Sequence, residues 1–150
     1  RTGKLDEAIE LYQSALTMAP ENETLLISLA ESHTTKKNYS EAAKYYKKAA
    51  ALNPRNEAAH YNLAITYVRL AKYKFAIQTF KEMLAYQPYN PKLYYNIACI
   101  HAKQDNKDQA ARWLKKAVGH GYENWEYIRQ DKDLENIRQT DYYRQLLQEH

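Results

Sequence analysis

The sequence repeats itself with a period of 34 residues, and this period limits the possible folds more than any other feature of the chain. Proline recurs at positions 20, 54 and 88, and asparagine follows each proline by two positions. The period also holds for two alanine columns and two larger apolar columns: Ala8, Ala42, Ala76, Ala110; Ala30, Ala64, Ala98; Tyr12, Tyr46, Phe80, Leu114; Leu29, Leu63, Ile97. Such a period is typical of a stack of supersecondary units.

Within each unit the apolar residues are three and four positions apart, which is the spacing of a helix face. Alanine is suited to places where two antiparallel helices approach closely, and the proline behind the second helix ends it. The pairs Lys37-Asn38 and Ala71-Lys72 separate the two helices of a unit. The chain holds only three glycines and four prolines, so we expect an all-α fold and not a turn-rich β fold.

These columns resemble the tetratricopeptide-repeat (TPR) family, and the resemblance covers about 120 residues without an insertion between repeats. We expect full repeats at 23–56, 57–90 and 91–122. Residues 1–22 are expected to be a partial first repeat, with the end of a first helix, its turn and a second helix. The resemblance implies a right-handed superhelical solenoid of antiparallel helix pairs, whose first helices line a concave, ligand-binding face.

The period is lost in residues 123–150, where apolar residues are spaced like short amphipathic helices. This tail is similar to segments that end bacterial tetratricopeptide arrays, and the apolar face of a last repeat needs such a cover. We therefore expect C-terminal capping helices, with Asp131 and Asp133 as helix-starting residues. A calcium loop is the alternative, but Asn136 stands at the turn glycine and Tyr142 at the bidentate glutamate.

The sequence offers little that suits catalysis or cofactor binding. Glycine occurs only at positions 3, 119 and 121, and phosphate-loop, G-x-S-x-G and H-E-x-x-H motifs are absent. Cys99 has no evident partner base, and His101, two positions away, faces another side of a helix. His33 and His101 share the packing column of Tyr67. We therefore predict no enzyme, no catalytic residue, no cofactor and no metal.

The charge balance also excludes classes of partner. There are 22 Lys and Arg against 18 Asp and Glu, a formal net charge of +4 without a basic run, so we expect no nucleic acid partner. No apolar run approaches the roughly 20 residues of a membrane span, so we expect no membrane insertion. The start, Arg1-Thr2-Gly3-Lys4, suggests a chain that begins inside a longer protein. The compartment stays open, with the cytoplasm slightly favoured.

The resemblance implies that a peptide or protein segment binds along the first helices. Carried over by position, the predicted peptide-binding residues are Ile27, Glu31, Tyr61, Asn62, Ile65, Arg69, Lys92, Tyr95, Asn96 and Lys103. The two tyrosines suit hot spots of a protein interface, and the basic residues of the third and fourth repeats favour acidic groups on the partner. The chain is thus predicted to be a protein–protein interaction scaffold.

A self-assembly scaffold is the alternative, in which the open N-terminal end, residues 5–18, packs on another copy. The pattern by which some repeats bind the C-terminal carboxylate of chaperones is matched at two of five places. Glu31 stands where that pattern needs a donor. A chaperone co-factor is therefore not the favoured interpretation.

Overall fold

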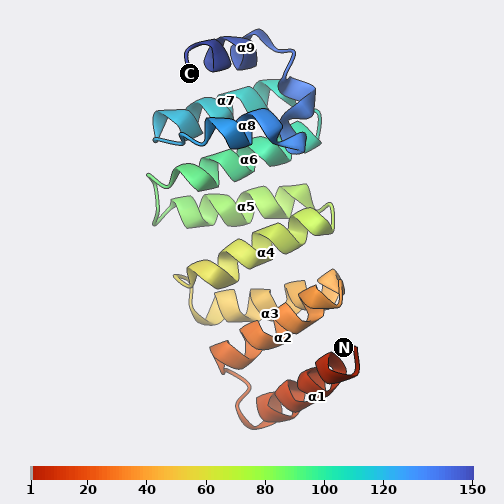
Figure 1. Ribbon diagram of the computed structural model, residues 1–150. Coiled ribbons are helices and arrows are strands. Elements are labelled where there is room, and N and C mark those ends of the chain that lie inside the picture. Colours follow the sequence, from red (N-terminus) through yellow and green to blue (C-terminus); the bar gives the residue numbers. More distant parts are fainter. Residues whose placement is uncertain (1) are drawn as a thin grey trace. The chain divides into compact units, whose positions relative to one another are not determined.

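The computed structural model describes residues 2–150, except for the side chain of Thr2, and the described residues form helices without strands. Figure 1 shows their order: α1 (Thr2–Met18), α2 (Glu23–Thr35), α3 (Tyr39–Leu52), α4 (Glu57–Arg69), α5 (Tyr73–Leu84), α6 (Pro91–Lys103), α7 (Lys107–Gly119), α8 (Trp125–Gln130), the 3-10 helix η1 (Lys132–Ile137) and α9 (Asp141–Gln148). The chain forms two compact units, Arg1–Thr79 and Phe80–His150, and we describe each by itself.

The asparagine that follows each proline by two positions starts the first helix of the next pair. The Asn22 side chain accepts a hydrogen bond from the backbone N–H of Leu25 at 3.0 Å, and Asn56 accepts one from Ala59 at 2.8 Å. Asn90 does the same for Lys92 at 3.1 Å. Each bond satisfies one of the backbone donors that the first turn of a helix leaves without a partner.

The turn between the two helices of a pair also recurs with the period. Lys37, Ala71 and Asp105 adopt φ values of 60°, 54° and 56°, in the left-handed region. The next backbone N–H in each turn, as in Asn38 to His33 at 2.8 Å, reaches back five residues to a carbonyl of the preceding helix. This is a Schellman motif, which normally places glycine at the left-handed residue. The chain uses non-glycine residues at all three places.

The N-terminal segment differs from the sequence prediction in one respect. We expected the end of a first helix and a turn before the second helix, but α1 is continuous from Thr2 to Met18. Gly3 lies inside this helix, whereas Gly121 is the glycine with a positive φ, 92°, in the described part of the chain. A glycine breaks a helix only where the chain needs the left-handed conformation, and the backbone at Gly3 does not.

The core of the N-terminal unit lies among α1 to α4. Ala30 and Ala42 are fully buried where α2 and α3 pack together, and Tyr46 fills the space beside them. Leu63 of α4 packs into the same cluster, and Leu16 of α1 lies against it. The alanine columns predicted from the sequence are thus confirmed as the places of closest packing, because a larger side chain would separate the helices.

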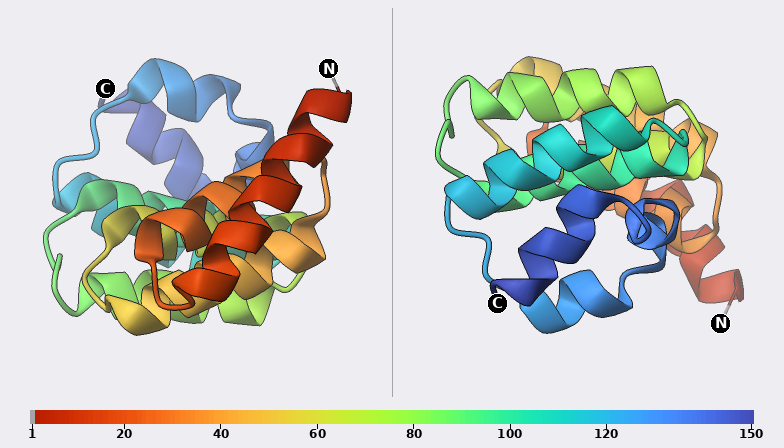
Figure 2. Two further views of the ribbon diagram at one scale, coloured as in Figure 1. Left: turned by 90° about the horizontal axis from the view of Figure 1, so that it is seen from below. Right: turned by 90° about the horizontal axis from the view of Figure 1, so that it is seen from above.

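The core of the C-terminal unit joins the tail to the α6–α7 pair. Ile128 of α8 and both Leu134 and Ile137 of η1 are fully buried in one cluster with Ala98 and Leu114. The right-hand view of Figure 2 shows α8, η1 and α9 gathered beside α6 and α7. The prediction that the tail forms capping helices is confirmed.

Ala64 provides a test of the close packing in α4. It is fully buried, so Ala64→Leu should lower the free energy of unfolding by about 1–3 kcal/mol through overpacking. Ala58→Leu makes the same chemical change at an exposed position of α4 and should have little effect. Denaturant melts followed by circular dichroism measure both, and equal stabilities would contradict the packing at Ala64.

Ala71 provides a test of the turn. Because its φ is 54°, Ala71→Gly should remove a steric cost and stabilise the chain by about 0.5–1 kcal/mol. Ala111→Gly, inside α7, makes the same change in a right-handed helix and should destabilise by roughly 1 kcal/mol. The opposite signs of the two substitutions are the expected result of denaturant melts. A loss of stability in both would show that Ala71 bears no such cost.

Candidate functional site: the first-helix surface

The N-terminal unit exposes most of the predicted binding residues on α2 and α4. Glu31 and Arg69 are exposed, and Tyr61 has an exposed fraction of 39%. Ile27, Asn62 and Ile65 are partly buried beside them. We call these six residues, Ile27, Glu31, Tyr61, Asn62, Ile65 and Arg69, the first-helix surface. Their surroundings provide apolar, amide and charged groups of both signs.

Two features of unit 1 position α2 and α4. The helix α3 packs against both of them, so the two first helices are held by one common neighbour. At their N-terminal ends the carboxylate of Glu23 accepts hydrogen bonds from the side-chain amides of Asn53 and Asn56. Asn56 therefore caps α4 with its oxygen and links α4 to α2 with its nitrogen.

The C-terminal unit treats the equivalent positions of α6 differently. Lys92 is exposed and Asn96 is partly buried, but Tyr95 has an exposed fraction of only 4%. The prediction that Tyr95 is an open anchor for a partner is therefore wrong. The tail of the same chain covers this face of α6, and Lys103 forms an ion pair with Asp133 at 2.6 Å.

Aromatic stacking holds the start of the tail on α6. The rings of Tyr95 and Tyr122 are nearly parallel, at an angle of 3° with 4.2 Å between their centroids. Tyr127 lies tilted to Tyr95 with 6.0 Å between centroids. Contacts between aromatic rings add to the gain from burying their area, so Tyr95 anchors the tail of its own chain.

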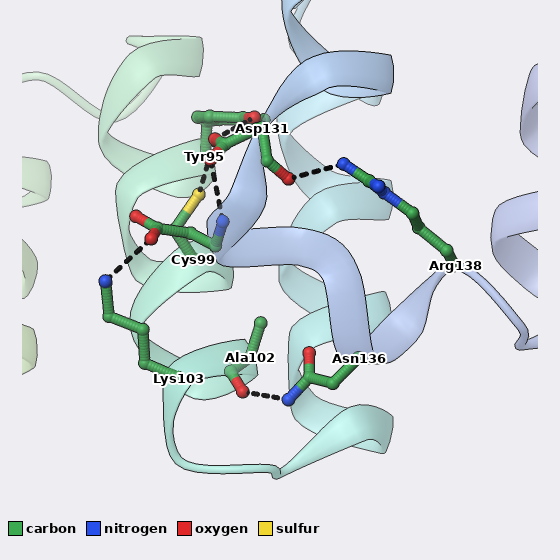
Figure 3. Close-up of polar contacts among 8 residues, drawn as sticks. Tyr95, Cys99, Ala102, Lys103, Asp131, Asn136 and Arg138 are labelled. Atoms are coloured by element: carbon green, nitrogen blue, oxygen red, sulfur yellow. Dashed lines mark hydrogen bonds and ion pairs between the residues drawn. The ribbon is translucent and has the colours of Figure 1, made fainter.

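Asp131 is the centre of the polar contacts between the tail and α6 (Figure 3). The Tyr95 hydroxyl donates to its carboxylate at 2.6 Å, and the Cys99 thiol donates to the same oxygen at 3.6 Å. The other carboxylate oxygen accepts from the backbone N–H of Asp133 at 2.9 Å and so caps η1. The guanidinium of Arg138 donates to the Asp131 backbone carbonyl at 3.1 Å.

A second polar contact lies one turn further along α6. The side-chain amide of Asn136 in η1 donates to the backbone carbonyl of Ala102 and, at 3.3 Å, to the carboxylate of Asp105. The Ala102 carbonyl belongs to the last turn of α6, where carbonyls have no partner within the helix. The tail therefore satisfies the polar groups at this end of α6 as well as its apolar face.

The electrostatics of this contact disfavour reactive chemistry. Burial, together with the nearby carboxylates of Asp131 and Asp133, raises the pKa of the Cys99 thiol well above its ordinary value. Burial, followed by the neighbouring Cys99 and Asp131, also raises the pKa of Tyr95. Both groups stay protonated at neutral pH and act as donors. Because the thiolate is the nucleophilic form of cysteine, Cys99 does not suit nucleophilic catalysis.

Cys99, Asp131 and Asp133 also form the one cluster in residues 2–150 whose ligand atoms, within 4.8 Å of one another, suit a cation. Each member already has a protein partner: Tyr95 and Cys99 donate to Asp131, and Lys103 pairs with Asp133. The protonated thiol is a poor metal ligand, since metals bind the thiolate. We interpret the cluster as a structural contact.

The sequence pattern indicated part of this arrangement. Asp131 does cap a helix, as expected from its position before η1. Its second role, as the acceptor for Tyr95, had no local signal because 36 residues separate the two. The position of Tyr95 in a first helix suggested exposure, and only the placement of the tail reveals its burial.

Cys99, the single cysteine, makes the contact between tail and α6 measurable. Tyr95→Phe removes the donor to Asp131 and should make opening of the tail easier by about 1–3 kcal/mol. A thiol reagent should then modify Cys99 faster, by roughly 5- to 150-fold, if local opening limits the reaction.

Tyr89→Phe is the matched control, because Tyr89 is exposed and lies outside this contact. Its rate of thiol modification should equal that of the unchanged chain. Equal rates for Tyr95→Phe and the unchanged chain would contradict the role of the Tyr95 hydroxyl.

No helix in the described residues combines the length and the apolarity needed to cross a membrane.

Comparison with known proteins agrees with this architecture. Among solved structures, MamA of strain MSR-1 is 26% identical, with a TM-score of 0.69, covering 79% of this chain and 68% of that one. Another MamA structure is 19% identical, with a TM-score of 0.75 and coverage of 99% and 78%. MamA from Desulfovibrio magneticus RS-1 is 16% identical, with a TM-score of 0.70 and coverage of 99% and 86%.

A search of curated proteins finds no match. A family model described as "Psidin, N-terminal TPR repeats region" matches residues 1–121. This range includes the three periodic proline and asparagine positions and all four alanines of the Ala8 column. Because the model matches more than half of the chain, the chain belongs to the tetratricopeptide-repeat family, as described by the Psidin N-terminal TPR repeats region.

Proposed function

We propose that this chain binds a segment of a partner protein on the first-helix surface of its N-terminal unit. The chain is a helical-repeat scaffold for protein interactions, and its family uses first helices for binding. The observation that carries the proposal is a difference between equivalent positions. Tyr61 and Tyr95 are one period apart, yet Tyr61 is 39% exposed and Tyr95 is 4% exposed.

The cover on α6 indicates what chemistry suits the equivalent positions of α4. Ile65 corresponds to Cys99, and Arg69 corresponds to Lys103. On α6 an aromatic ring stacks on Tyr95, and a carboxylate pairs with Lys103. A partner segment with an aromatic residue for Tyr61 and a carboxylate for Arg69 would reproduce these contacts on α4.

The rest of the first-helix surface adds direction. Glu31 on α2 favours a basic group, whereas Arg69 on α4 favours an acidic one, so the partner segment would run with a fixed polarity across α2 and α4. Asn62 can both donate to and accept from a peptide backbone. The predicted contribution of Lys92 and Asn96 stays a prediction, and Lys103 takes part only through its pair with Asp133.

The proposed role is non-catalytic. Binding through two neighbouring helices requires a rigid surface with exposed aromatic and charged groups, and it requires no activated nucleophile or bound cofactor. Self-assembly is the second candidate function, and the observation that favours it is the exposed apolar stripe of α1, described below.

A photo-crosslinking amino acid at position 61 tests the proposal in cells. It should capture a defined partner, and the captured segment should contain an aromatic residue and an acidic residue. The same crosslinker at Lys115, an exposed residue of α7, serves as the matched control and should not capture that segment.

Titration calorimetry with the captured segment as a synthetic peptide measures the energies. Tyr61→Ala should weaken binding by about 1–3 kcal/mol, a roughly 5- to 150-fold loss of affinity. Lys115→Ala should leave the affinity unchanged. If Tyr61→Ala binds as well as the unchanged chain, the first-helix surface is not the binding site.

A further inference from the structure

The exposed side of α3 forms an open hollow of about 530 Å³, lined by Glu41, Lys44, Tyr45, Lys47, Lys48 and Ala51. The ring of Tyr45 is held in place because it stacks on His33, at 5.6 Å between centroids and 8° between planes. Burial lowers the pKa of His33, so its ring stays neutral at pH 7. The hollow therefore combines a fixed apolar ring with a rim of lysines.

The lysines of this hollow carry more charge than their neighbours compensate. Lys44 pairs with Glu41, which uses the one carboxylate that lines the hollow. Lys47 and Lys48 form no ion pair with any residue in the described part of the chain, although the Lys48 amine lies 5.8 Å from the centroid of the Tyr45 ring. A ligand of this hollow gains from an apolar group flanked by carboxylates.

The exposed stripe of α1 has this chemistry. Glu7, Leu11, Ser14 and Met18 are separated by four, three and four positions, so they lie on one side of the helix, and Glu10 is beside them. Leu11 and Met18 are 70% and 89% exposed, respectively. Glu7 and Glu10 are exposed and form no ion pair within residues 2–150.

We infer that α1 of one copy of this chain docks on α3 of a second copy. Leu11 of the first copy enters the hollow beside Tyr45, and its Glu7 and Glu10 meet Lys47 and Lys48. Burial of exposed Leu11 supplies the apolar gain, and the two pairs of opposite charges set the orientation. This inference gives a surface to the self-assembly candidate, and it uses none of the six residues of the first-helix surface.

The symmetry of this contact follows from its composition. The two surfaces are different, so the contact is heterologous, and each added copy leaves one α1 and one α3 unused. Association is thus open-ended unless the rotation between copies closes a ring. Two helices bury a small area, so the contact belongs to the weak, reversible class of interfaces.

Sedimentation velocity at increasing protein concentration tests the inference first. The weight-average mass of the unchanged chain should rise with concentration at low salt. It should fall again when salt is added, because the Debye length shrinks from about 30 Å at 0.01 M to about 8 Å at 0.15 M. A chain that stays monomeric at all concentrations in low salt would overturn the inference.

Charge reversal identifies the surfaces. Lys47→Glu with Lys48→Glu in one variant, and Glu7→Lys with Glu10→Lys in another, should each make the chain monomeric, since like charges then face each other. An equal mixture of the two variants should regain the rise in mass with concentration, because opposite charges again meet. A mixture that stays monomeric, while both variants keep the circular dichroism of the unchanged chain, would show that α1 and α3 do not pair.

A matched control removes the effect of net charge. Arg112→Glu with Lys115→Glu, on exposed positions of α7, changes the formal charge by the same amount as the reversal on α3 and should leave association intact. Leu11→Ser keeps every charge and should reduce association at least tenfold, which isolates the apolar part. Association that survives Leu11→Ser and both charge reversals would place the contact elsewhere.

Discussion

Close approach of helices through alanine is the constraint on which the rest of this structure depends. Ala30 and Ala42 are fully buried between α2 and α3, and Ala98 and Ala110 are fully buried in the α6–α7 pair. Only a methyl group fits at such a place, so the larger side chains pack around it. The pair geometry then fixes which residues remain on the outside of each helix and hence which residues can meet a partner.

The tail is part of the C-terminal core and not an appendage. It contributes fully buried Ile128, Leu134 and Ile137, and each such side chain stabilises by about 1.5–3 kcal/mol relative to exposure. Asp131 adds a hydrogen-bonded acceptor for Tyr95 and Cys99. Displacement of the tail by a partner would lose all of these contacts at once, so we expect the covered face of α6 to stay closed.

Two surfaces of the N-terminal unit remain for interactions, and they differ in chemistry. The first-helix surface presents Tyr61 between charges of opposite sign, which suits one bound segment in one direction. The exposed sides of α1 and α3 are instead complementary to each other, with Leu11 and two glutamates on one and Tyr45 and two lysines on the other. A helical-repeat scaffold with both surfaces can assemble and still bind a partner.

The sequence by itself determined the repeat, the helix pairs and the capping tail, because these depend on local periodicity and on small or apolar residues at fixed positions. It also marked the helix starts, since Asn22, Asn56 and Asn90 act on backbone groups two or three residues away. Only the tertiary structure decided that Tyr61 is exposed and Tyr95 is buried. The two tyrosines have the same local pattern, and the difference arises from a contact with Asp131, 36 residues further along the chain than Tyr95.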